Sequence, residues 1–325
     1  MKKILLLLGL LLMLSTGCGK FIDAENTESS NYKITDETGV TTVFAKAPQR
    51  ILTLAMSSDA IVMGLGLEDK LVAVNYLADD PVSSNIVKQA KKISYKIKNP
   101  SIEEIIALKP DVIFVYDWID MNRIENLRAL GLKVVVLKGP VTLEDIQSNI
   151  NTIACSLDRK ASGEQLIQSM NNKLKEIKEK LADLKIKQKK SLVLISLMTS
   201  YGGEGCIFDD MCKQAGVING LSAAGIKNGQ VLTKEMLVTI NPDFLIMPVY
   251  NNHKTFDIDK YNKEFLDDQS LQTMKAIKTN QLFYPKEGYI YNCSQDFVFG
   301  VQEIAYLAYG EIFAQGEAQH LRVSE

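Results

Sequence analysis

Short apolar runs and longer amphipathic segments follow one another along the chain from Pro48 onward. "RILTLA", "LVAVNY", "DVIFVY" and "KVVVL" have the length of buried strands, and the segments between them carry apolar residues at three- and four-residue steps. This order predicts a mostly parallel sheet with helices on its faces. The order resumes near residue 191 with "SLVLISL" and "DFLIMPVY", so the chain contains two α/β halves. The preceding "ITDETGVTTVF" predicts a hairpin in which Gly39 takes the positive φ of the turn.

One segment between the halves has a different period. Residues 158–190 contain no proline, and their apolar residues form a narrow stripe on a charged rod: Leu166, Met170, Leu174, Ile177, Leu181 and Leu184. The stripe suits a coiled-coil dimer, or a helix that links two lobes and lies along both. We predict an α/β fold with two similar Rossmann-like lobes, residues 33–157 and 191–325, joined by one long α-helix over residues 158–190. A ligand cleft is expected between the lobes.

A phrase of the first half returns in the second. "SIEEIIALKPDVIF" begins at Ser101, and "TKEMLVTINPDFLI" begins 132 positions later at Thr233. In both copies a Glu, either Glu103 or Glu235, stands seven residues before a Pro-Asp pair that opens an apolar run. One phrase in equivalent places of two halves indicates two similar lobes and not an array of many short repeats.

The first residues predict where the protein works. Lys2 and Lys3 precede an apolar stretch, residues 4–14, that is too short to span a bilayer. "STGCGK" follows, and the whole resembles a bacterial lipoprotein signal cleaved before Cys18. We therefore expect a signal peptide over residues 1–17, then the lipidated Cys18 and a flexible tether over residues 18–32, which would place the protein outside the cytoplasm on a lipid anchor in the bacterial cell membrane. An ordinary secretory signal and an N-terminal anchor are the alternatives.

Composition excludes several classes of function. The chain has 37 basic and 39 acidic residues with no basic stripe, so nothing indicates a nucleic-acid partner. Its two histidines, His253 and His320, are too few for a multi-histidine metal site, and the cysteines lack a metal-binding spacing. The disulfide state of four of them stays open: Cys155, Cys206, Cys212 and Cys293. No catalytic triad is apparent, so we do not expect an enzyme.

The order of these phrases, with "AGVING" and "LQTMKAIKTNQLFY" near the end, resembles the helix-linked class (class III) of substrate-binding lipoproteins for ABC importers. This class delivers vitamin B12, haem and ferric siderophores, and the resemblance covers Tyr32 to about Phe313. It implies an extracytoplasmic monomer with no intrinsic cofactor that carries an iron or cobalt chelate to an ABC permease and its ATPase. It also implies that Glu103 and Glu235 dock into permease arginines. A solvated residue that favours the helix dipole is the plainer alternative, and Glu104 competes with Glu103.

Ligands of open α/β sheets lie beyond the carboxyl ends of the strands. The residues expected to bind ligand there are Met56, Ser57, Tyr76, Tyr116, Trp118, Tyr201, Tyr250, Tyr289 and Tyr291. Trp118 and Tyr201 are the first candidates, because flat amphipathic rings suit a macrocycle or an aromatic chelate. No arginine stands at a predicted strand end, which favours cobalamin, haem or a near-neutral chelate over a catecholate. Whether His253 or a tyrosine ligates metal stays open, as do the binding of another small solute and a sensory or structural role.

Overall fold

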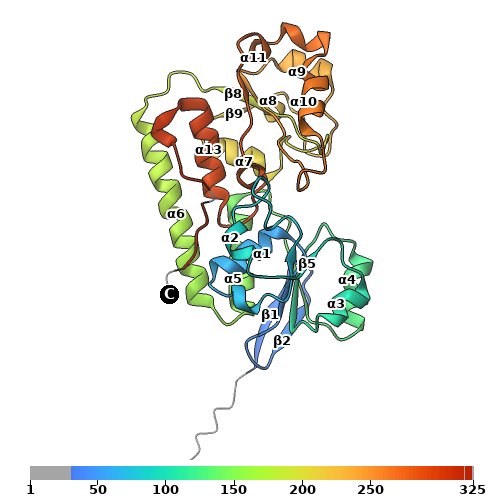
Figure 1. Cartoon of the computed structure of the whole chain (residues 1–325). Coiled ribbons are helices and arrows are strands. Elements are labelled where there is room, and N and C mark those ends of the chain that lie inside the picture. Colours follow the sequence, from blue (N-terminus) through green and yellow to red (C-terminus); the bar gives the residue numbers. More distant parts are fainter. Residues whose placement is uncertain (1–30, 318, 324–325) are drawn as a thin grey trace, which may run out of the picture. The chain divides into compact units, whose positions relative to one another are not determined.

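The computed structural model describes residues 31–317 and 319–323 (Figure 1). The predicted signal peptide, Cys18 and most of the predicted tether lie outside these residues. Within the described ranges, no helix has the length and apolar character that a membrane crossing requires. Cys155, Cys206, Cys212 and Cys293 are free thiols.

The N-terminal lobe, as we name the elements from β1 to α5, begins with an antiparallel hairpin of β1 (Tyr32–Thr35) and β2 (Thr41–Phe44). This confirms the predicted hairpin, and Gly39 has a φ of 78° in its turn. A parallel sheet follows in the order β3 (Ile51–Thr53), β6 (Val112–Tyr116), β7 (Val134–Leu137), and β4 (Val74–Asn75) pairs with β5 (Lys96–Ile97). The helices are α1 (Met56–Gly64), η1 (Glu68–Lys70), α2 (Val87–Ala90), α3 (Ile102–Ala107), α4 (Met121–Ala129) and α5 (Leu143–Ser156).

The C-terminal lobe, from β8 to η3, has a second parallel sheet. Its order is β11 (Leu282–Phe283), β10 (Phe244–Ile246), β8 (Ser191–Leu194), β9 (Ile218–Asn219). The helices are α7 (Ile207–Gln214), α8 (Gly220–Ala223), α9 (Lys234–Ile240), α10 (Ile258–Leu266), η2 (Gln269–Thr273), α11 (Lys275–Lys278), α12 (Glu287–Ile290), α13 (Phe297–Tyr309) and η3 (Glu311–Phe313). The two parallel sheets confirm the predicted α/β class.

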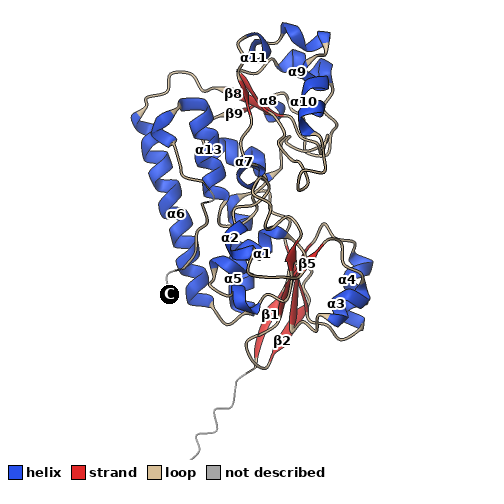
Figure 2. Ribbon diagram, in the orientation of Figure 1, coloured by secondary structure: helices blue, strands red, loops and turns tan. Residues whose placement is uncertain are grey.

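Side chains of each sheet alternate between two hydrophobic clusters. In β6, Val112, Phe114 and Tyr116 face a cluster that includes α1 and α5, whereas Ile113 and Val115 face one that includes α3 and α4. Figure 2 shows these helices on the two sides of the first sheet. The second sheet alternates in the same way between α7 with α13 and α9 with α11. Successive side chains of each strand therefore pack against helices on opposite faces of the sheet, which is why these strands are apolar throughout.

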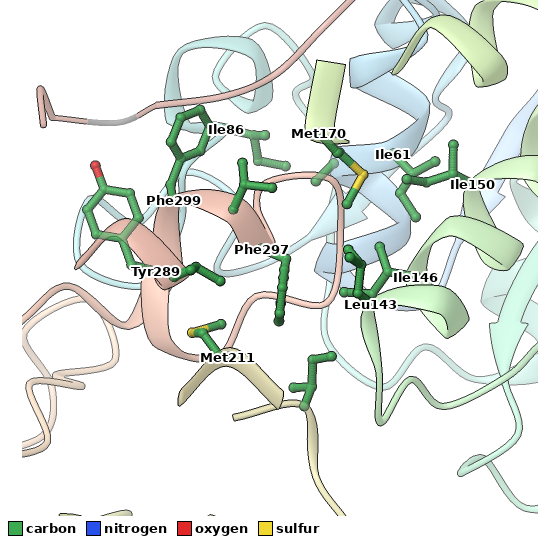
Figure 3. Packing of buried hydrophobic residues seen from close by; sticks show 14 of the residues in the cluster. Ile61, Ile86, Leu143, Ile146, Ile150, Met170, Met211, Tyr289, Phe297 and Phe299 are labelled. Carbon is green, nitrogen blue, oxygen red and sulfur yellow. The ribbon is translucent and has the colours of Figure 1, made fainter. Parts of the chain in front are cut away.

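The first of these clusters belongs to both lobes. It joins Ile61 and Ile150 of the N-terminal lobe to Met211 and Phe297 of the C-terminal lobe, with Met170 among them (Figure 3). The C-terminal segment adds a further tie, because the Val323 N–H donates to the Gly64 carbonyl at 2.9 Å. The lobes thus share a continuous core in place of meeting only at a hinge.

The long helix between the lobes is α6 (Lys160–Asp183), which lies alongside α5 and α13 (Figure 1). Its stripe is buried at Leu166, Met170, Leu174 and Ile177, and Leu181 packs partly against the same core. Leu184, predicted to belong to the stripe, is 38% exposed because the helix ends one residue before it. Because α5 and α13 of the same chain cover the apolar stripe, a coiled-coil dimer is not required to explain it.

The repeated phrase folds in the same way twice. Ser101 and Thr233 cap α3 and α9, since each side chain accepts a hydrogen bond from a backbone N–H of the first turn. Each helix ends before a residue in the left-handed region, Lys109 with a φ of 47° and Asn241 with a φ of 45°. A proline follows in both copies and prevents the helix from continuing.

The aspartate after that proline anchors the neighbouring strand. Asp111 Oδ2 accepts hydrogen bonds from the backbone N–H groups of Gln49 and Arg50, directly before β3. Asp243 Oδ2 accepts one from the backbone N–H of Ser191, at the start of β8. The Pro-Asp pair is therefore a folding element that fixes two neighbouring strands of each sheet.

Candidate functional site

A cavity of about 370 Å³ lies between the lobes, and we call it the cleft cavity. The N-terminal lobe lines it with Met56, Leu77 and Ser83, and the C-terminal lobe with Ser196, Leu197, Met198, Tyr250, Glu287 and Tyr291. Most of this surface is apolar, and none of the described residues that line it is basic. Such a volume and lining are typical of small-molecule sites.

Parallel strands place these side chains. Met56 opens α1 shortly after β3, and residues 196–198 follow β8. The loop after β10 brings in Tyr250. The hydroxyl of Tyr291 donates to Ser196 Oγ at 2.9 Å, and its ring lies 5.3 Å from that of Tyr201. The cavity therefore occupies the carboxyl edge of both sheets, where the sequence predicted a ligand.

Glu287 is the charged residue among those that line the cleft cavity. Burial raises the pKa of its carboxyl to about 7, and the nearby Asp80 adds to the rise, although a hydrogen bond from the Tyr250 backbone acts in the opposite direction. The carboxyl can therefore change its charge near neutral pH when a ligand alters its surroundings.

A second cavity of about 330 Å³, the Trp118 cavity, lies in the N-terminal lobe. Its lining is Leu54, Asn75, Tyr76, Ile97, Lys98, Asn99, Pro100, Trp118, Ile119 and Arg123. Trp118 is 58% exposed and stacks on Tyr116 with ring centroids 4.3 Å apart. Lys98 Nζ lies 4.6 Å from the centre of the Tyr76 ring. Two cationic side chains thus border this cavity, in contrast to the cleft cavity.

Arg123 reaches the Trp118 cavity although it stands at no strand end. This residue lies on α4, and its guanidinium donates to the carbonyl of Pro100, which brings it to the Trp118 cavity. The absence of arginine from strand ends is therefore weaker support for a neutral ligand than the sequence indicated.

Contacts between the lobes separate the two cavities. Tyr76 of the Trp118 cavity and Tyr250 of the cleft cavity bring their hydroxyl oxygens to 3.3 Å. His253 Nε2 lies 2.9 Å from the Tyr76 carbonyl oxygen, and His253 Nδ1 lies 3.4 Å from Asp80 Oδ2. Residues 252–254 all have positive φ, so this loop adopts a strained conformation where it meets the other lobe.

The predicted ligand-binding residues fall into several places. Met56, Tyr250 and Tyr291 line the cleft cavity, Tyr76 and Trp118 line the Trp118 cavity, and Ser57 lines a small neighbouring cavity with Met56 and Glu287. Tyr201 borders a cavity of about 120 Å³ beside the start of α9. The structure therefore brings together most of the set around the edges of the two sheets.

Two of the predicted residues lie in the hydrophobic core. Tyr116 has no exposed surface, because it shares the inward face of β6 with Val112 and Phe114. Tyr289 is 5% exposed, and its hydroxyl donates to the Gly316 carbonyl at 3.0 Å. A ligand would have to displace Trp118 to reach the Tyr116 ring. Alternation along "DVIFVY" was the signal for the burial of Tyr116.

Sequence reasoning missed several residues that line the cavities: Leu77, Ser83, Ser196, Leu197, Met198, Lys98, Arg123 and Glu287. Ser196 to Met198 directly follow a predicted strand, so their position was available from the pattern. Glu287 gave no signal, because it lies in a four-residue helix of a loop-rich segment.

Glu103 and Glu235 have matching surroundings. Both are exposed in the first turn of their helices, and in both the helix N-terminal backbone and the capping hydroxyl, of Ser101 or Thr233, hold the carboxyl pKa below its usual range. Glu104 differs, because its Oε1 accepts a hydrogen bond from the Tyr95 hydroxyl at 3.1 Å.

Comparison with known proteins adds a family and a fold. The sequence profile of the periplasmic binding protein family matches residues 51–289. The chain is 24% identical over 316 residues, 92% of its length, to the uncharacterized ABC transporter substrate-binding lipoprotein YvrC of Bacillus subtilis, of which the match covers 94%. It is 32% identical over 141 residues to the vitamin B12-binding protein of Vibrio campbellii, which is 42% of this chain and 49% of that protein.

Solved structures share the fold at low sequence identity. The apo haem-binding protein RhuT from Roseiflexus sp. RS-1 has a TM-score of 0.68 and 19% identity, covering 80% of this chain and 97% of that one. The molybdate-binding protein MolA of Haemophilus influenzae has a TM-score of 0.69 and 19% identity, covering 85% and 90%. One two-lobed fold therefore serves ligands as different as haem and molybdate. The fold alone does not identify the ligand of this protein, whereas the lining of its cavities restricts the choice.

Proposed function

The chain belongs to the periplasmic binding protein family, and from this premise we propose that it is the extracytoplasmic solute-binding component of an ABC importer. In this role it captures a metal chelate between its lobes and delivers it to a membrane permease. The observation that carries the proposal is the cleft cavity, which lies at the carboxyl edges of both sheets and is lined from both lobes. A shape of this kind binds a solute without needing catalytic groups.

The lining favours a broad and partly apolar ligand. Tyr250 and Tyr291 offer flat rings with polar ends, and Met56 and Met198 offer adaptable apolar contacts. Trp118 and Tyr76 extend the aromatic surface into the neighbouring cavity. An iron or cobalt chelate, such as cobalamin, haem or a ferric siderophore, has this character, and the protein needs no cofactor of its own to hold it.

We assign permease docking to Glu103 and Glu235. Each is exposed at the start of a helix in equivalent positions of the two lobes, and an ionised carboxylate can pair in bidentate fashion with a guanidinium. Two matching acidic points suit a permease with two matching basic ones. Such exposed charges chiefly set the rate and the orientation of docking.

The remaining parts of the proposal concern the anchor and the assembly. The sequence before the described residues supports lipidation at Cys18, and a relative similar over nearly all its length is a lipoprotein by name. We propose a monomer, because α5 and α13 of the same chain cover the stripe of α6.

The test is a melting-temperature screen of the full-length protein purified in detergent. The probes are cyanocobalamin, haem, molybdate, and ferric hydroxamate, catecholate and citrate complexes. A probe at a hundred times its dissociation constant stabilises the protein by about 2.7 kcal/mol, which gives a clear rise in melting temperature. The absence of a shift with every probe would contradict the capture of a chelate.

A further inference from the structure

The lining of the cleft cavity contains one acidic side chain and no basic one among the described residues. Glu287 is the only charged group among the described residues that line it, and the others are apolar or neutral. Glu287 is partly buried, and a carboxylate withdrawn from water is costly unless a partner donates hydrogen bonds to it or carries positive charge. The composition of the wall therefore constrains what the cavity accepts.

The groups around Glu287 do not neutralise it. The structure gives its carboxyl no ion pair within the described ranges, and the adjacent Lys286 pairs instead with Glu317 at 3.5 Å. Asp80 adds negative charge nearby, and it faces His253 at 3.4 Å. The Tyr291 hydroxyl is occupied by Ser196 Oγ.

The short helix that carries Glu287 is fixed against the other lobe. The Gly288 N–H donates to the Val82 carbonyl at 3.2 Å. A Cβ at Gly288 would lie 2.6 Å from Asn85 Oδ1 and 3.0 Å from the backbone of Ser84, so the two segments are in direct contact. This contact therefore holds the backbone that carries Glu287 against the N-terminal lobe.

Two cationic side chains of the N-terminal lobe face the other cavity. Lys98 lies over the Tyr76 ring, and Arg123 donates to the Pro100 carbonyl; both line the Trp118 cavity. The contact between Tyr76 and Tyr250 separates that cavity from Glu287. Positive charge is thus available beside Trp118 and absent from the wall of the cleft cavity.

We infer that Glu287 sets the specificity of the cleft, which takes a neutral or cationic chelate that presents an N–H or O–H donor to this carboxyl and excludes a chelate with an anionic group at that position. This inference rests on the proposed function and names the ligand class within it. An N–H or O–H group of the ligand can replace the hydrogen bonds to water that the Glu287 carboxyl loses on burial. An anionic group of the ligand would instead be repelled by this carboxyl, with little water to screen the repulsion.

The protonation of Glu287 supports the assignment. Its pKa is raised to about 7 by burial and by Asp80, so an approaching donor or cation shifts the carboxyl to its charged form. A cationic ligand should therefore bind more tightly as the pH rises through about 7.

The experiment uses one ferric hydroxamate in three charge forms: the complex of desferrioxamine B, whose free amine is cationic, its neutral N-acetyl derivative and its anionic N-succinyl derivative. Cyanocobalamin and haem extend the panel. Binding is measured by titration calorimetry with the full-length protein in detergent, for the wild type, Glu287→Gln and the matched control Glu303→Gln. Glu303 is also a partly buried carboxyl with a raised pKa, but it lies on α13, where its Oε2 accepts from Gln315.

The expected result has two parts. The wild type binds the cationic or neutral probe more tightly than the anionic one, and cyanocobalamin more tightly than haem, whose propionates are anionic. Glu287→Gln weakens the cationic probe by about tenfold or more, strengthens the anionic probe and removes the pH dependence, whereas Glu303→Gln changes neither. A preference of the wild type for anionic probes, or an unchanged order in Glu287→Gln, overturns the inference while the proposed function stands. Failure of all probes to bind contradicts the proposed function and removes the inference with it.

Discussion

The hydroxyl oxygens of Tyr76 and Tyr250 lie 3.3 Å apart, although the two residues belong to different lobes. Burial raises the pKa of Tyr250 to about 12, and the hydrogen bond with Tyr76 contributes to the rise. His253 reinforces the contact through the Tyr76 carbonyl and Asp80. A ligand that occupied both cavities would have to separate this set, and we expect these contacts to control how fast ligand leaves.

Replacement of His253 should therefore change binding kinetics more than stability. His253→Ala removes two polar contacts between the lobes, and we expect the dissociation rate of a bound chelate to rise by about three- to tenfold. Stopped-flow measurement with the chelate found in the melting screen gives this rate. Lys254→Ala is the matched control, because Lys254 is exposed and has a positive φ in the same loop. An equal effect of the two substitutions would show that backbone strain, and not the imidazole, is responsible.

The shared core predicts that both lobes unfold together. Phe297 is fully buried in the cluster that joins the lobes, so Phe297→Ala should lower the free energy of unfolding by about 3–5 kcal/mol. Urea denaturation followed by tryptophan fluorescence and by circular dichroism should give coincident transitions, since Trp118 reports on one lobe and the helices report on both. Phe256→Ala, at a ring that is 39% exposed, should cost far less. Separate transitions for the two probes would mean that the lobes are independent.

The same core limits motion on binding. A large closure of the two lobes would have to separate α1 and α5 of the N-terminal lobe from α7 and α13 of the C-terminal lobe. This separation would expose apolar side chains that are now buried in the shared cluster with α6. Small-angle scattering should therefore give nearly the same radius of gyration with and without bound chelate. A change of several Å would refute this and would require a hinge that the packing does not provide.

Much of the fold could be predicted because its signals are local. The hairpin around Gly39, the alternation of strands and helices, and the stripe of α6 each follow from the period of apolar residues over a short stretch. The repeated Pro-Asp phrase marked equivalent places in the lobes, although its reason, the anchoring of β3 by Asp111, appeared only in the structure.

The site was harder to predict because its residues meet across long distances in sequence. Tyr116 stands at a strand end, where the sequence predicts ligand-binding residues, but its side chain lies on the same face of β6 as Val112 and Phe114 and is buried in the core. Arg123 and Glu287 reach their cavities through contacts with Pro100 and with the segment near Val82, and no pattern within their own segments indicates either. The positions of the strand ends therefore predicted where the cleft lies. The charged residues of the two cavities, such as Arg123 and Glu287, lie outside the strands and were not predicted.

Docking to the permease should depend on Glu103 and Glu235 and not on Glu104. The double variant Glu103→Ala, Glu235→Ala should lose stimulation of the transporter's ATPase, because both carboxylates are exposed and equivalent. Ligand affinity, measured by calorimetry, should stay unchanged. Glu104→Ala is the control, since that side chain already accepts the Tyr95 hydroxyl. Full stimulation by the double variant would refute the docking assignment.

Stability should fall as the pH rises from about 4 to about 7, and Asp59 should account for part of the fall. Asp59 is fully buried and accepts hydrogen bonds from the Thr53 hydroxyl and the Asn75 N–H, yet burial raises its pKa from 3.8 to about 7. Between those two values the folded state keeps a proton that the unfolded state has released, so the stabilisation is complete below the lower pKa and is lost as the pH passes the higher one.

The variant Asp59→Asn tests this prediction through the slope of the free energy of unfolding against pH. Each unit of pKa difference corresponds to about 1.4 kcal/mol, so the wild type should lose up to roughly 4 kcal/mol across this window, and the variant should lose that much less. The measurement is the free energy of unfolding in urea at a series of pH values. Asn removes the titration, and its amide can still accept from the Asn75 N–H and donate to the Thr53 hydroxyl oxygen, so the stability of the variant at low pH should stay close to that of the wild type. Parallel curves for the wild type and the variant would mean that the pKa of Asp59 is not raised in the folded protein, and that the hydrogen bonds from Thr53 and Asn75 offset its burial.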